Sequence, residues 1–558
     1  MRKEMCFRLS LFLILFVFAI MGKAESPDQK VLCDSHPQLC TEKNKPTDYE
    51  GKYIGHDEPS LLFYSNKKGS GNNNVYFLTL PKDPPILPNQ TGTGGTFHFQ
   101  LHPAFWFGMA ICDNESFPNF TRTCVPDTDA NIFDNPNLSA PDWMGHHPGT
   151  GFMEMQFYPP GWVLWPPGNS CDPDKWCAAL NIDSLSENLT NLNNKACINA
   201  AGDEYVNFAF VTNDGVAQDA ASPANGSDAK FTPDPNKTFF MNSGDNLQVV
   251  LRDTRAGFRV DIFDRTTNTH GSMTASIANG FAHPVFDPSA TSCTVTPYAF
   301  HPMYATSSEH TRVPWAAHSY NIAFSDEIGH FEYCSGIAGF FSPTCQSPDE
   351  PMTSPTFDDF VCFGPAASSR IPIGGCFGTD VDFDGPEYGN TWPGTFTNVA
   401  LDRQFHGQPI RFSSPLFAAK DEDLDDLHLR NYSRVAFEAD LPRIELLLSP
   451  PCNRLTGANC TNPPVPGSFY PIYTTFNSKR LESCIWQEGG ANIPGTINAF
   501  GGTSTAEYGP LLLLNYPAAP PAGFIFRFNN FRQILNHNPC RVSEDLIKAV
   551  GGEDDDDN

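Results

Sequence analysis

The feature that most constrains the fold is a period-two alternation of apolar and polar side chains, which recurs in short segments. Its clearest instance is Leu247–Asp264, where apolar residues alternate with more polar ones on both sides of a turn at 255–257. Successive side chains of a strand point to opposite faces of a sheet, so this pattern predicts a hairpin with one buried face. Similar segments at Phe152–Tyr158 and Tyr205–Thr212 predict further strands.

A second hairpin is predicted near the start of the alternating region. Ser60–Ser65 and Val75–Leu80 are both strand-like, and a Gly/Asn-rich stretch at 66–74 separates them. Stretches of this composition favour tight turns, so we expect the second strand to return beside the first.

The composition supports an all-β fold. The chain has 50 Pro, 43 Gly and 46 Phe residues, which is typical of many short strands joined by frequent turns. We predict two β-sandwich units, jelly-roll-like or lectin-like, with long loops, disulfide bonds and little helix. One short helix is expected over Glu544–Val550, with Ser543 as its N-cap.

The domain organisation follows shifts in composition. Residues 346–359 are rich in Pro, Ser and Asp and are predicted to be a linker or long loop. The predicted regions are a signal peptide (1–24), an extended arm (25–52), a β-sandwich domain (53–345), the linker (346–359), a second β-rich domain (360–552) and an acidic disordered tail (553–558). Strands of the second domain are expected within Val435–Leu448, Ser468–Phe476 and Phe524–Phe528.

The first residues are typical of a secretory signal peptide. A basic start is followed by the apolar segment Leu9–Ile20 and by small residues up to Ala24. Later segments are shorter than the roughly 18 apolar residues that a membrane span needs. We therefore expect a secreted, extracellular protein without a membrane anchor.

The cysteine content indicates an oxidised protein. Of 17 cysteines, Cys6 lies in the signal segment, so an even number of 16 remains. Local disulfides are predicted between cysteines close in sequence, although the connectivity stays open. The close pairs are Cys33/Cys40, Cys112/Cys124, Cys171/Cys177, Cys334/Cys345, Cys362/Cys376 and Cys452/Cys460.

Nine Asn-x-Ser/Thr motifs follow the signal segment, which predicts a glycoprotein. The predicted glycosylation sites are Asn89, Asn114, Asn119, Asn137, Asn188, Asn225, Asn236, Asn431 and Asn459.

The formal net charge is -28, so the chain is a polyanion. A negative field repels nucleic acid, and we exclude nucleic acid as a partner. It favours a carbohydrate polymer or a mineral or other cationic surface, while solubility alone also explains such a charge.

The candidate site lies where ionisable residues are densest. The segments Arg312–Cys334 and Gly149–Trp165 both contain predicted strands, and a shared sheet would bring Glu154 near Glu332. Paired carboxylates are the groups that glycosidases use as acid and as nucleophile or base. We therefore predict Glu154 and Glu332 as candidate catalytic residues.

Aromatic residues beside this segment are candidate ligand contacts. Trp162, Trp165 and Tyr158 follow or end the strand that carries Glu154. Aromatic rings stack on sugar rings, but they also fill hydrophobic cores, and both interpretations stay open.

A candidate calcium loop occurs at Asp380, Asp382 and Asp384, with Gly385 next. Alternate carboxylates before a Gly resemble the first half of an EF-hand loop, because calcium prefers six to eight oxygen ligands. The twelfth position is Thr391 rather than Glu, so an acidic surface turn is the alternative. Calcium is the one cofactor that the sequence suggests.

We expect a non-catalytic matrix, wall or surface protein that binds carbohydrate or mineral cations such as calcium. The alternative is a polysaccharide-active glycoside hydrolase that uses Glu154 and Glu332. A copper site with His318 and His330 is a weaker alternative. The chain lacks the nucleophile elbow, the phosphate-binding glycine loop and the dinucleotide motif, which argues against those enzyme classes.

Overall fold

The computed structural model describes the strand-forming parts of the chain and the segments that join some of them. The described residues are 60–65, 73–82, 104–112, 150–160, 171–185, 194–201, 204–285, 287–302, 320–327, 337–338, 344–345, 362–363, 375–376, 408, 410–420, 427–440, 473–479, 482–488, 514–515, 527–528, 530–535 and 538–551. The predicted signal peptide, arm, linker and acidic tail lie outside them.

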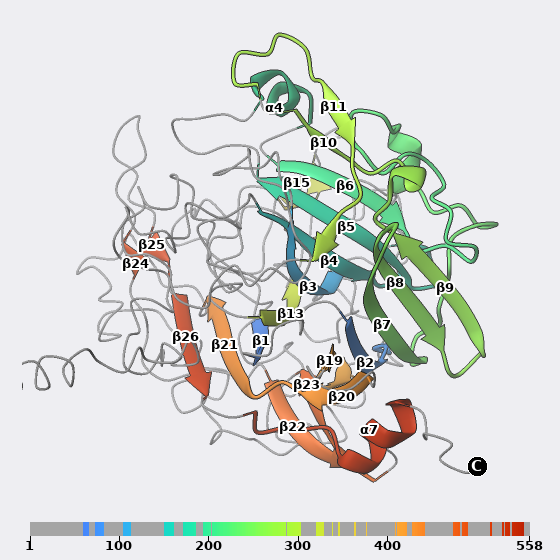
Figure 1. The fold of residues 1–558 in the computed structure, drawn as a ribbon, viewed down its shortest axis with the longest axis vertical. Coiled ribbons are helices and arrows are strands. Elements are labelled where there is room, and N and C mark those ends of the chain that lie inside the picture. Colours follow the sequence, from blue (N-terminus) through green and yellow to red (C-terminus); the bar gives the residue numbers. More distant parts are fainter. Residues whose placement is uncertain are drawn as a thin grey trace, which may run out of the picture.

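The larger strands form two antiparallel sheets, which we call sheet I and sheet II (Figure 1). Sheet I has nine strands, and β12 (His301–Pro302) pairs with β3 beside the main path. In order, that path is β26 (Asn530–Leu535), β21 (Arg434–Asp440), β1 (Ser60–Ser65), β13 (Tyr320–Glu327), β3 (Ala104–Cys112), β4 (Thr150–Tyr158), β5 (Cys177–Leu185) and β6 (Glu204–Phe210).

Sheet II also has nine strands, and β19 (Leu416–Lys420) pairs with both β2 and β20 (Leu427–Asn431). Its path is β22 (Tyr473–Ser478), β23 (Ser483–Glu488), β18 (Arg411–Ser413), β2 (Asn73–Thr79), β7 (Asn246–Thr254), β8 (Gly257–Asp264) and β9 (Thr269–Thr274).

The remaining described elements are short. The two-stranded pairs are β10 (Ala282–Pro284) with β11 (Val295–Pro297), β14 (Ile337–Ala338) with β15 (Thr344–Cys345), β16 (Cys362–Phe363) with β17 (Gly375–Cys376), and β24 (Leu514–Asn515) with β25 (Arg527–Phe528). The helices are α4 (Lys195–Ala201), α7 (Glu544–Gly551) and the 3-10 turns η3 (Asp228–Phe231) and η4 (Ile277–Asn279). The mostly β content confirms the all-β class expected from the composition.

The hairpin β7–β8 forms as predicted, but the predicted β1–β2 hairpin is wrong. Thr254 pairs with Gly257 across the turn of β7–β8, and Gly257 has a φ of 131°, which glycine tolerates best. In contrast, β1 pairs with β13 and β21 in sheet I, while β2 lies in sheet II. The two strands lie in facing sheets, where Phe63 of β1 and Tyr76 of β2 are both buried in the shared core.

Strands from the two predicted domains lie in the same sheets. In sheet I, β21 and β26 from the 360–552 region extend the sheet beyond β1. In sheet II, β18 and β19 from that region pair with β2. Within the described chain, both regions therefore contribute to one hydrophobic cluster, because their strands are neighbours in each sheet.

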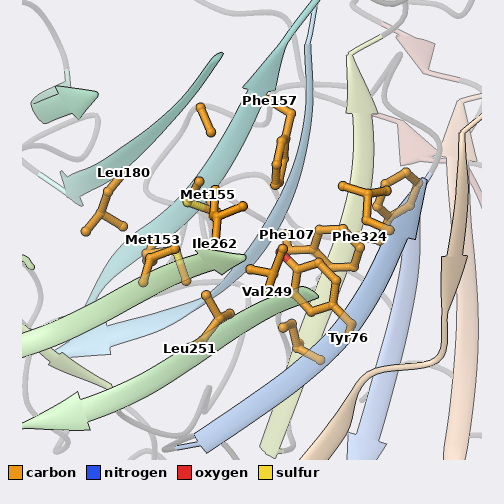
Figure 2. Close-up of a cluster of buried hydrophobic side chains, with 14 of the residues drawn as sticks. Tyr76, Phe107, Met153, Met155, Phe157, Leu180, Val249, Leu251, Ile262 and Phe324 are labelled. Carbon is orange, nitrogen blue, oxygen red and sulfur yellow. The ribbon is translucent and has the colours of Figure 1, made fainter. Parts of the chain in front are cut away.

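The inner faces of the two sheets meet in this cluster (Figure 2). Phe107 of β3 stacks on Tyr76 of β2 with ring centroids 3.7 Å apart. The Phe107 ring also contacts the Phe412 ring of β18 edge-on, with ring centroids 5.4 Å apart. The ring centroids of Phe324 on β13 and Phe412 on β18 are 4.3 Å apart, so aromatic contacts join the two sheets. Several of the many Phe residues therefore pack where the two sheets face each other.

Strand β3 was not predicted from the sequence. Its residues are apolar at both alternating sets of positions, and Phe105, Trp106 and Phe107 are all buried. A strand buried on both faces loses the period-two pattern and cannot be told by periodicity from another buried segment. Phe105 and Phe107 belong to the core between the sheets, and Trp106 on the opposite face is also fully buried.

Three disulfides lie among the described residues. Cys171–Cys177 confirms one predicted local pair. Cys197–Cys293 and Cys484–Cys540 join cysteines 96 and 56 residues apart, which no spacing argument indicated. Structural disulfides indicate that the chain folds in an oxidising environment.

The C-terminal helix α7 confirms its prediction. Ser543 caps it, since its hydroxyl oxygen accepts a hydrogen bond from the Leu546 backbone N–H at 3.3 Å. The helix packs through Leu546, Ile547 and Val550 against Val75 of sheet II and its neighbours. None of the helices described here is both long and apolar enough to cross a membrane.

Candidate functional site

Strand β4 presents the best described candidate site on the outer face of sheet I. Met153, Met155 and Phe157 of this strand are buried in the core between the sheets. Glu154 and Gln156 point the other way and are half-buried. The alternation predicted for Phe152–Tyr158 is therefore confirmed, and Glu154 lies on the face away from the core.

A chain of hydrogen bonds connects the polar side chains on this face. The Gln156 amide donates from Nε2 to Oε2 of Glu154 at 2.5 Å. The Tyr158 hydroxyl donates to Oε1 of Gln156. The Asn181 amide on β5 donates from Nδ2 to the Tyr158 hydroxyl at 3.4 Å. Glu154 is thus held by side chains that are themselves held in place.

Asn181 adds an unsatisfied acceptor to this network. It lies directly opposite Glu154 in the β4–β5 register and is only 4 % exposed. Its Oδ1 atom has no hydrogen-bond partner among the residues that the structure describes. A buried polar atom without a partner costs about 1–3 kcal/mol, so this position is costly to maintain for stability alone.

A second carboxylate, Asp183, lies on the same face. It is two positions beyond Asn181 on β5 and is therefore a diagonal neighbour of Glu154. Diagonal neighbours on adjacent antiparallel strands have their backbones about 7–8 Å apart. Sequence reasoning missed Asp183 because no strand was predicted over Cys177–Leu185.

The predicted partner residues of Glu154 are only partly described. Strands β4 and β13 do lie in one sheet, as expected for their segments, with β3 between them. Glu332, Trp162 and Trp165 lie outside the described residues, as do His318 and His330 and the candidate calcium ligands Asp380, Asp382 and Asp384.

Tyr158 is described, and its ring is buried. It packs with Cys177 and Phe208 in a small cluster on the outer face of sheet I. The ring centroid of Phe208 lies 6.5 Å from that of Tyr158. Tyr158 therefore contributes to the polar row through its hydroxyl group, which bonds to Gln156 and Asn181.

Lys230 lies beside this outer cluster and has a perturbed pKa. Burial lowers the pKa of Lys230 to about 8, against the opposing charges of Asp219 and Asp228. Its ammonium group donates to the Ala221 carbonyl oxygen at 2.9 Å, and the residue is 3 % exposed. We interpret Lys230 as a structural tie of the 221–231 segment rather than as a nucleophile, because its ammonium group is bound to a backbone carbonyl oxygen of that same segment.

Three of the nine predicted glycosylation sites are described. Asn225 and Asn236 are exposed in turns. The Asn431 amide instead donates to the Val542 carbonyl oxygen at 3.0 Å and accepts from the Val542 N–H at 2.9 Å. This two-way bond links β20 to the segment that leads into α7, so Asn431 has a structural role that the motif did not indicate.

Among the described residues, no group of three or more His, Cys, Asp or Glu side chains is arranged to hold a metal ion. Comparison of the chain with known protein families, curated proteins and solved structures gives no match. The function is therefore argued from the chemistry of the site.

Proposed function

We propose that the protein is a secreted acidic glycoprotein that binds carbohydrate through the outer face of β3, β4 and β5. We further propose that its two sheets form a jelly-roll-like sandwich. The observation that supports binding is the hydrogen-bonded row of Glu154, Gln156 and Tyr158 beside Asn181, whose Oδ1 finds no partner in the described part of the chain. On this proposal the protein is a matrix, wall or surface component rather than a catalyst.

The chemistry of the row suits a sugar. Every sugar hydroxyl both donates and accepts a hydrogen bond, and Asn, Gln and Glu side chains supply matching donors and acceptors. A ligand hydroxyl that donates to Oδ1 of Asn181 would satisfy this acceptor. The half-buried Glu154 and Gln156 are the solvent-facing part of the row, so a ligand would enter there.

A polysaccharide pull-down tests this proposal. The purified full-length protein is mixed with a panel of insoluble neutral polysaccharides, and retention is compared with that of Asn181→Leu and Glu154→Gln. We expect about a tenfold loss of affinity for both variants, since each lost charge-assisted or buried hydrogen bond is worth roughly 1–3 kcal/mol. Glu544→Gln, an exposed change on α7, is the matched control. Retention unchanged in both variants contradicts the proposal.

The alternative is a glycoside hydrolase on the same face. In a hydrolase, Asp183 would be a better partner for Glu154 than a more distant acid, because Asp183 lies on the adjacent strand. Glycosidases place two carboxyl groups about 5–9.5 Å apart, and the backbones of a diagonal pair on adjacent strands lie close enough for their carboxyl groups to reach this separation. Release of reducing sugar in the same pull-down tubes, lost in both Glu154→Gln and Asp183→Asn, would establish the hydrolase. Retention without release supports the binding protein.

Two further parts of the proposal concern calcium and glycans. We propose that Asp380, Asp382 and Asp384 bind calcium, so chelation should lower the melting temperature of the protein and calcium should restore it.

We also propose glycans at the exposed Asn225 and Asn236. Peptide mass spectrometry of the secreted protein checks both sites, and unmodified Asn225 and Asn236 would contradict this part.

A further inference from the structure

A cluster of cationic side chains lies on the outer face of sheet II, around one buried carboxylate. Arg259 binds Asp261 with two nitrogens, at 2.7 Å through Nη2 and 2.9 Å through Nε. Arg252 approaches the same carboxylate at 2.9 Å, and Nε2 of His270 lies 3.1 Å from it. Asp261 is 2 % exposed, whereas Arg252 is 48 % exposed.

The strand register assembles this cluster. Arg252 of β7 lies opposite Arg259 of β8, and Asp261 follows two positions later on the same face. His270 of β9 lies opposite Phe263, which is two positions further along β8. All of these side chains point away from the core, because the residues between them, such as Val260 and Ile262, are buried in it.

The cluster has a positive charge in excess. Burial by itself raises the pKa of Asp261, but the hydrogen bonds and charges of Arg259, His270 and Arg252 outweigh burial and bring that pKa below its usual value. The carboxylate is therefore ionised at neutral pH and faces two guanidinium groups. Arg265, which donates to the Gln248 side chain on the same face, adds a third cation.

A flat aromatic surface borders the cations. Phe263 is 37 % exposed, although it is a large apolar residue on a strand. The His270 ring stacks on it with centroids 4.5 Å apart and planes inclined by 28°. The exposed ring therefore has a fixed orientation beside His270, which also contacts Asp261 at the centre of the cluster.

We propose that this face binds an acidic polysaccharide, with the guanidinium groups on a sugar carboxylate and the Phe263 ring under a sugar ring. Asp261 orders the two arginines and occupies only part of their N–H groups, so the remaining N–H groups can hold a carboxylate. Nucleic acid fits less well, because duplex DNA carries a charge about every 1.7 Å, and the net charge of -28 repels so dense a polyanion more strongly than it repels a polymer with one carboxylate per sugar ring. An acidic peptide offers carboxylates but no flat sugar face for Phe263.

This inference goes beyond the proposed function, since the site is on the other sheet. The inner faces of sheets I and II meet in the core, so their outer faces are on opposite sides of the molecule. A protein with both sites would connect a neutral polymer on one side to an acidic polymer on the other.

A matched pair of polymers tests the site. The probe is polygalacturonate, and its fully methyl-esterified form retains the sugar chain but lacks the charge. With the full-length protein, we expect binding to polygalacturonate, at least tenfold weaker binding to the ester, and weakening by salt. Equal affinity for both polymers, or no binding to either, would overturn the inference.

Three variants assign the binding to this face. Arg252→Gln and Phe263→Leu should each weaken polygalacturonate binding by about fivefold to tenfold. Both positions are well exposed, and unchanged melting temperatures would show that the variants fold. Arg541→Gln, an exposed change outside the cluster, should bind like the wild type. Unchanged binding in both Arg252→Gln and Phe263→Leu contradicts the inference.

Two controls distinguish this site from the sheet I face and from a general anion patch. Glu154→Gln should leave polygalacturonate binding unchanged, so failure of the sheet I proposal would not remove this one. Competition by an oligonucleotide or by polyglutamate as strong as competition by free polygalacturonate would indicate a general anion patch and contradict the polysaccharide assignment.

Discussion

The outer faces of the two sheets arise from the same alternation but carry different chemistry. On sheet I, amide and hydroxyl groups surround the half-buried Glu154. On sheet II, arginines and a histidine surround the buried Asp261. A net charge of -28 describes neither face, so the ligand preference of each face depends on which side chains the register brings together.

Asn181 and Asp261 show this difference at the level of single residues. Both are almost fully buried, at 4 % and 2 % exposure. Asp261 has partners for both of its oxygens, whereas Oδ1 of Asn181 has none in the described part of the chain. A satisfied buried group stabilises its surroundings, and an unsatisfied one is retained at a cost, which is typical of binding sites.

The largest effect on stability is expected in the core between the two sheets, because this core supports both outer faces. Phe107→Ala should lower the free energy of unfolding by about 4 kcal/mol, because its buried ring stacks on Tyr76 and meets Phe412 from the other sheet. Denaturant unfolding measures this loss, and binding at both faces should weaken together at elevated temperature. A loss below about 1 kcal/mol would contradict a core shared by the two sheets.

The next effect concerns the sheet II face alone. Asp261→Ala leaves Arg252, Arg259 and His270 without their carboxylate and should cost about 2 kcal/mol at neutral pH, less than a fully buried pair because the arginines are partly exposed. The pKa of Asp261 is lowered in the folded protein, so its contribution is present above the unfolded value of about 4 and is lost as pH falls through the folded pKa. Unfolding curves of wild type and variant should therefore converge in acid. A constant difference at all pH values would contradict the ionic origin.

Asp245, which immediately precedes β7 of sheet II, should behave in the opposite way. Burial and a hydrogen bond with Asp264 raise the pKa of Asp245, while bonds from Asn242 partly oppose this. The folded pKa lies above the unfolded one, so the stability that the protonated form contributes is lost as pH rises through the folded pKa. Asp245→Asn should therefore raise the free energy of unfolding by about 1 kcal/mol at neutral pH, since the new amide can donate to Asp264, and should have little effect in acid. Thermal melts across the acid range check this, and a variant that is less stable at neutral pH would show the sign to be wrong.

The smallest change in stability is expected on the sheet I face. Asn181→Leu removes the unsatisfied Oδ1 and the long bond to Tyr158 and replaces the amide by an apolar group of similar size. The change in the free energy of unfolding should stay below about 1 kcal/mol, in either direction. The change in the free energy of unfolding can then be compared directly with that of Asp261→Ala. Asn181 and Asp261 are about equally buried, so a difference would show that their contributions to stability differ. A loss as large as that of Asp261→Ala would mean that Asn181 is a structural residue.

Several features could be predicted because they depend on nearby residues. The hairpin β7–β8, the two faces of β4, the Cys171–Cys177 disulfide and the Ser543 cap of α7 each involve residues close in sequence. Alternation, turn composition and capping act over that range. The predicted β1–β2 hairpin failed for a reason of longer range, since β1 pairs with β13 and β21, whereas β2 pairs with β7, β18 and β19 in the other sheet.

The candidate site was predictable only in part. Glu154 was found through the alternation of its own strand, and its place in one sheet with β13 agrees with the expectation for the two segments. Asp183, Asn181 and the arginine cluster were missed. Each is defined by a neighbour on another strand, and no spacing in the sequence specifies which strands are neighbours.

The sequence by itself determined the β content, the strand faces, the acidic net charge and the cysteine content that favours disulfides, because these follow from composition and local periodicity. Only the tertiary structure decided that β21 lies beside β1 and β18 beside β2, although more than 300 residues separate them. It also decided that Arg252, Arg259 and His270 meet at Asp261. The physical reason is that burial of apolar surface depends on total area rather than on position in the chain, so distant strands pair and thereby set the charge of each outer face.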